Sequence, residues 1–159
     1  MPTRYTSRPF PAYRHRPGLT PHPVRDPDGH SYEKTSANET VDEDSWFTSE
    51  TYLFAIDLLN DGYYWEAHEE LEGLWLTAGR DSPIGRFLQG IIQLAAALLK
   101  LEAGKTQSAT KLCEAAAAKL REPAQTYLGL DGERLAEQLE HRLGNPDQTL
   151  FRVDLILPT

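Results

Sequence analysis

Hydrophobic residues recur at helical spacing along most of the chain and predict five helices. The expected helices cover residues 45–60 or 49–60, 63–77, 83–103, 105–122 and 132–143. The clearest boundary is Ser82-Pro83, because serine caps a helix N-terminus well and proline is favoured at the first helical position. The helix predicted over 83–103 is apolar on most sides, which is typical of a central, buried helix.

Both ends of the chain lack this pattern. Residues 1–32 hold seven of the eleven prolines, which block helix formation, yet they also contain aromatic residues. We therefore expect an ordered, extended arm over the helices, with a disordered tail as the alternative. Near the C-terminus apolar residues alternate with polar ones, which predicts an extended segment packed along the body; these residues are Phe151, Val153, Leu155 and Leu157.

The predicted fold class is all-α: a single compact antiparallel bundle of about five helices, with an extended N-terminal arm and a C-terminal tail. We expect three regions in the chain. They are a proline-rich arm and acidic linker over 1–44, a helical domain over 45–146, and an extended tail over 147–159.

Charge is spread unevenly along the chain, whose formal net charge is −8. Residues 1–25 carry five arginines and no acid, whereas residues 26–159 have a net charge of −13. An acidic body argues against nucleic acid as the main partner, because phosphate binding needs a basic surface. With no apolar signal-like run at the N-terminus, we expect a cytoplasmic protein with no membrane partner.

The candidate chemistry lies in the helix predicted over 63–77. A helical wheel places His68 and Glu72 in the arc expected to be buried, between Trp65 and Trp75, while Glu69 lies at its rim. The spacing His68-Glu69-x-x-Glu72 matches a zinc-protease helix motif with glutamate in place of the second histidine. His68 and Glu72 could then share a divalent metal ion, and Glu69 would be the general base.

A catalytic zinc site needs three protein ligands, so a further ligand would have to come from another segment. His22 and His30 of the predicted arm are candidates. The helix over 83–103 presents one polar stripe that could face this cluster, formed by Arg86, Gln89 and Gln93. Together with Trp65 and Trp75, the stripe could orient a ligand; alternatively, it could complete a hydrogen-bonded network that only holds the helices in register.

Two longer motifs contain these residues. They read Asn60-x-Gly62-Tyr63-Tyr64-Trp65-Glu66-Ala67-His68-Glu69-x-x-Glu72-x-x-Trp75 and Arg86-Phe87-x-Gln89-Gly90-Ile91-Ile92-Gln93. The chain resembles, in these motifs, a prokaryotic helical family known as domain of unknown function 309. The resemblance implies a compact domain of antiparallel helices and no assigned activity. It also adds Glu66 to the polar motif, although the helical wheel places Glu66 on the exposed side.

We therefore carry two hypotheses. The first is a small-ligand or metal-binding protein with hydrolysis as a candidate activity and with its site at a buried cluster between the helices over 63–77 and 83–103. The second is a non-enzymatic interaction or homodimerisation module of tetratricopeptide-like helical hairpins, in which the cluster is structural. A faint repeat at an offset of 42 residues, in which Ala55, Leu59 and Gly62 align with Ala97, Leu101 and Gly104, resembles the packing of such hairpins. Its period departs from their period of about 34 residues, however, and generic helical hairpins, which we favour, would give the same pattern. The partner would be an unidentified small molecule or protein.

Overall fold

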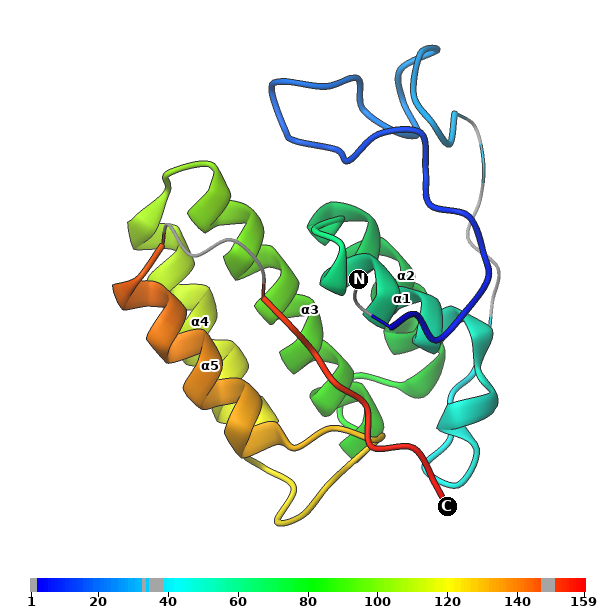
Figure 1. Ribbon diagram of the computed structural model, residues 1–159, viewed down its shortest axis with the longest axis vertical. Coiled ribbons are helices and arrows are strands. Elements are labelled where there is room, and N and C mark those ends of the chain that lie inside the picture. Colours follow the sequence, from blue (N-terminus) through cyan, green and yellow to red (C-terminus); the bar gives the residue numbers. More distant parts are fainter. Residues whose placement is uncertain (1–2, 33, 35–38, 147–150) are drawn as a thin grey trace.

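The computed structural model describes residues 3–32, 34, 39–146 and 151–159 of the chain. Five α-helices follow a single 3₁₀ turn, η1 (Trp46–Thr48), and each helix packs against its neighbours in the sequence (Figure 1). The helices are α1 (Glu50–Asn60), α2 (Tyr64–Ala78), α3 (Pro83–Glu102), α4 (Thr106–Leu120) and α5 (Gly132–Gly144). No strand occurs within the described ranges, so the predicted all-α class is confirmed.

Side-chain caps fix three of the helix starts. The hydroxyl of Ser49 accepts a hydrogen bond from the backbone N–H of Tyr52, and that of Ser82 accepts one from Gly85. The carboxylate of Asp131 does the same for the first turn of α5. Each cap satisfies a backbone donor that the helix itself leaves unpaired, and the observed boundaries lie within a few residues of the predicted ones.

The core forms around α3, which contacts α2 on one side and α4 on the other. Large apolar side chains of α3, such as Phe87 and Leu88, are almost fully buried. Of the described helices, α3 has the length and apolar composition needed to cross a membrane, but half of its most apolar stretch is buried inside the fold.

The N-terminal arm lies beside α1 and α2, as the blue trace in Figure 1 shows. Its first anchor is Asp57 of α1, a buried carboxylate that accepts hydrogen bonds from the backbone N–H groups of Tyr5 (2.8 Å) and Thr6 (2.9 Å). The Thr6 hydroxyl donates a third bond to the same carboxylate, at 2.6 Å. Further along, the ring of Phe10 stacks on Tyr63, with 5.0 Å between centroids.

The C-terminal segment is extended and joins α1 to the arm. Asn60 pairs with both the N–H and the carbonyl of Val153, and the N–H of Leu155 donates to the hydroxyl of Tyr5. Phe151, Val153 and Leu155 are buried as predicted, whereas Leu157 is 51 % exposed. The prediction is therefore wrong for Leu157, and residues 147–150 of the predicted tail lie outside the described residues.

Candidate functional site

Three of the predicted site residues come together on one face of α2. His68 Nδ1 lies 3.4 Å from Glu69 Oε1, and His68 Nε2 lies 3.4 Å from Glu72 Oε2. One ligand atom from each residue lies within 4.8 Å of the others. We refer to His68, Glu69 and Glu72 as the α2 triad.

The α2 triad is not buried. Its side chains are 29 %, 41 % and 42 % exposed for His68, Glu69 and Glu72 respectively. The prediction that His68 and Glu72 lie in a buried arc is therefore wrong. Only the apolar stripe of α2, which includes Leu71 and Leu74, enters the core, and the neighbouring stripe stays partly open to solvent.

Glu66, which the helical wheel placed on the exposed side, is buried with 5 % of its surface accessible. Its Oε2 accepts a hydrogen bond from the backbone N–H of His15 at 2.8 Å and lies 2.7 Å from Nε2 of His30. Its Oε1 is buried and has no hydrogen-bond partner among the described residues. The exposed placement of Glu66 is wrong because the arm covers this side of α2.

The arm also places two histidine rings against Trp65. The rings of His15 and His22 make edge contacts with the indole, at centroid distances of 5.0 and 5.5 Å. Burial lowers the pKa of His15 from its usual 6.5. His22 accepts the backbone N–H groups of Val24 and Arg25 at its Nδ1, which holds the ring in place. Trp65 thus contacts the arm rather than the helical core alone.

Electrostatics connect the arm to the α2 triad through Glu69. Burial raises the pKa of this carboxyl, and the positive charges available at His68 and His22 lower it in part. Glu72 and Glu66 raise it further by like-charge repulsion. His22 therefore lowers the pKa of one residue of the triad, Glu69, whereas His30 pairs with Glu66.

A cavity of about 600 Å³ opens between the arm and helices α1 and α2. We call it the arm cavity. Three acidic residues of α2 line it: Glu66, Glu69 and Glu70. Arg8 of the arm pairs with Glu70 at 3.3 Å, and burial raises the pKa of Glu70. The remaining lining side chains are mostly aromatic or apolar.

The polar stripe of α3 faces α4, so the prediction that it faces His68 and Glu72 is wrong. Arg86 forms two hydrogen bonds with the carboxylate of Glu122, beyond the end of α4, and Gln93 accepts one from Lys119 at 3.0 Å. Gly90 lies on the same face, where a Cβ would come within 3.0 Å of the Cβ of Lys119. This close approach of α3 and α4 brings the stripe to their interface. Gln89 is half-buried there and has no side-chain hydrogen bond among the described residues.

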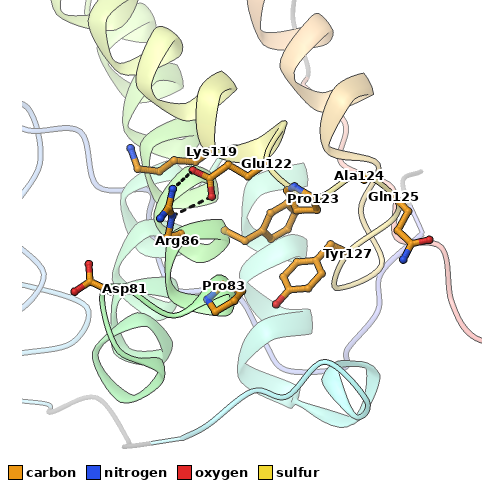
Figure 2. A pocket seen from close by; sticks show the side chains of 10 residues that line it. Asp81, Pro83, Arg86, Lys119, Glu122, Pro123, Ala124, Gln125 and Tyr127 are labelled. Atoms are coloured by element: carbon orange, nitrogen blue, oxygen red, sulfur yellow. Dashed lines mark hydrogen bonds and ion pairs between the residues drawn. The ribbon is translucent and has the colours of Figure 1, made fainter.

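Arg86 instead lines a second cavity, of about 610 Å³, at the ends of α3 and α4 (Figure 2). Figure 2 shows the Arg86–Glu122 pair at one side of this cavity and Tyr127 at the other. The ring of Tyr127 makes an edge contact with Phe87, with 5.0 Å between centroids. The predicted ligand-binding residues are thus divided between two places in the fold.

Trp75, the last predicted ligand-binding residue, packs against the edge of the core. The guanidinium of Arg80 lies over its ring at 5.4 Å. Its indole nitrogen is buried without a hydrogen-bond partner among the described residues.

The fold and the site together define an all-α protein built on two helical hairpins, α1–α2 and α3–α4, in which α2 displays a His–Glu–Glu triad. Residues 52–112, from α1 into α4, match the family described as Domain of unknown function (DUF309), which confirms the predicted resemblance to that family. No curated protein and no solved structure matches the chain. The matched segment contains the α2 triad, whereas the arm with its histidines precedes it.

Proposed function

We propose that this protein binds a divalent transition-metal ion through the α2 triad of His68, Glu69 and Glu72. The observation that supports the proposal is the approach of one ligand atom from each side chain to within 4.8 Å of the others. Imidazole and carboxylate groups are common ligands of Zn²⁺, Fe²⁺ and Mn²⁺.

Accessibility and charge also favour binding. The triad is partly exposed, so an ion can enter without unfolding of the helix. Three protein ligands leave at least one coordination position for water or a substrate, which is typical of catalytic rather than closed structural sites. An ion would favour the carboxylate form of Glu69, whose pKa is raised by burial and by Glu72.

A hydrolytic role remains a second step of this proposal. A bound ion with an open position can activate water, and the sequence hypothesis makes Glu69 the general base. Glu69 cannot be both ligand and base at the same moment, so Glu69→Gln separates the roles. Loss of metal in this variant identifies a ligand, while retained metal with loss of hydrolysis identifies a base.

The test is metal binding by the full-length chain. The protein is stripped with a chelator and titrated with Zn²⁺ or Mn²⁺ by calorimetry, and bound metal is measured after dialysis. We expect one equivalent in the unaltered protein and almost none in His68→Ala. His141→Ala removes an exposed histidine of α5 and should keep one equivalent. Absence of binding in the unaltered protein, or equal binding in His68→Ala, would refute the proposal.

The interaction-module hypothesis keeps its structural basis, because both helical hairpins are present. Binding of a protein partner or of a second copy by this protein stays a prediction. The cytoplasmic location stays one too, as does the expectation that nucleic acid and membranes are not partners.

A further inference from the structure

The arm cavity shares only Glu69 with the proposed metal site. Its volume of about 600 Å³ is within the range of small-molecule pockets, roughly 300–1,000 Å³. One wall comes from α1 and α2, and the other comes from the arm, which Figure 1 shows beside these helices. The cavity is therefore formed by segments far apart in the sequence.

Its lining has more acidic than permanently basic groups. Three carboxylates line it, those of Glu66, Glu69 and Glu70, against the two permanent cations of Arg8 and Lys34. Arg8 is paired with Glu70 at 3.3 Å. One carboxylate is left without a permanently charged partner, so a single added positive charge would balance the lining.

One oxygen of the buried Glu66 carboxylate lacks a hydrogen-bond donor among the described residues. Its Oε2 already receives the His15 backbone N–H and contacts His30, while its buried Oε1 has no partner among the described residues. A buried carboxylate oxygen without a donor is costly, more so than a neutral acceptor. Oε1 has almost no accessible surface, so a molecule in the cavity cannot reach it, but the negative charge of Glu66 acts on the cavity that this residue lines.

The cavity walls also suit the body of a cation. Aromatic rings of Phe10, Phe54 and Trp65 line it. The guanidinium of Arg8 already lies over the Phe54 ring at 4.4 Å while pairing with Glu70. Arg8 is thus an internal example of a planar cation held between an aromatic face and a carboxylate of the lining.

We propose that the arm cavity binds a small organic cation, in which an amidinium, guanidinium or ammonium group on a flat apolar body is held by the negative charge of Glu66 and Glu69. The charged group lies against Glu66 and Glu69, and the body lies among the aromatic side chains. This site and the α2 triad share one residue, Glu69.

The test is calorimetric titration of the full-length protein with benzamidine, in the presence of a chelator so that the metal site makes no contribution. Benzamide has the same shape without the charge, and benzoate has the opposite charge. We expect benzamidine to bind, benzamide to bind about tenfold more weakly or worse, and benzoate not to bind. Equal binding of benzamidine and benzamide, or no binding of benzamidine, would overturn the proposal.

Two variants locate the site, and a third is the control. Glu66→Gln should weaken benzamidine binding by about tenfold or more, because it removes the charge that the amidinium pairs with. Val24→Trp adds bulk to the arm side of the cavity without changing a carboxylate and should also abolish binding. Glu114→Gln removes an exposed carboxylate of α4 and should bind normally. Unchanged binding in a folded Val24→Trp protein places the ligand elsewhere and also refutes the proposal.

Discussion

Asp57→Ala tests whether the arm is held by the anchor that the structure assigns to it. Asp57 is 2 % exposed and accepts three hydrogen bonds from Tyr5 and Thr6, while the guanidinium of Arg4 lies 3.6 Å away. A hydrogen bond to a charged group contributes about 1.5–3 kcal/mol. The released backbone donors regain water, however, so the loss is less than the sum of three such bonds. We expect Asp57→Ala to weaken arm docking by roughly 3 kcal/mol.

Limited proteolysis measures this loss directly. Trypsin cleaves after Arg14, next to the buried His15, and it can do so only when the arm opens. When opening is fast, the cleavage rate follows the population of the open form, so 3 kcal/mol corresponds to about a hundredfold faster cleavage. Asp61→Ala is the matched control, because Asp61 is exposed just after α1 and should change the rate less than about threefold. A rate within threefold of the unaltered protein in Asp57→Ala would refute the assignment.

Two further predictions concern a turn and a buried histidine. Gly129→Ala should destabilise the fold by about 2–4 kcal/mol in urea unfolding, because φ is +76° and a Cβ would lie 2.4 Å from the Trp46 ring. Gly104→Ala, also at φ +76° but in open space, should cost only about 1–2 kcal/mol, and equal losses would contradict the steric argument. Burial lowers the pKa of His15 below 6.5, against the opposing effect of the Glu66 charge. Just below pH 6.5 the unfolded chain therefore binds more protons than the folded one, and stability falls as the pH falls. His15→Gln should lose less stability between about pH 7.5 and 5.5 than the unaltered protein does, and an equal loss would count against this account.

Local signals made the helices predictable. The caps at Ser49, Ser82 and Asp131 act within three residues along the chain, so the sequence displays each donor and acceptor side by side. The alternation from Phe151 to Leu155 likewise shows which side of an extended segment is apolar. Leu157 continues the alternation but is exposed. The alternation of apolar and polar residues does not show at which residue the contact with the helices ends.

The surroundings of the candidate site were less predictable because long-range contacts determine them. A helical wheel gives the angle of Glu66 around α2 but not what lies above it, and its partners His15 and His30 precede it by 51 and 36 residues. Arg86 similarly pairs with Glu122, 36 residues later, rather than with α2. The concentration of histidines in a proline-rich arm was the available signal for the covering of Glu66. The proximity of His68 and Glu72 was predictable, since i, i+4 spacing on one helix makes two side chains neighbours, whereas adjacent positions such as His68 and Glu69 are not brought together by helix geometry alone.

The two proposed sites differ in the parts of the chain that they need, because the α2 triad depends on local contacts and the arm cavity on long-range ones. The α2 triad lies wholly within residues 52–112, the segment that matches the family, so metal binding there requires only α2 and its neighbouring helices. The arm cavity also needs Arg8, Phe10 and His30, which lie before that segment. Glu69 belongs to both, and the charge of His22 acts on its carboxyl group. Occupation of either site by a cation would make Glu69 a weaker partner for a second cation, so the two ligands should bind with negative coupling.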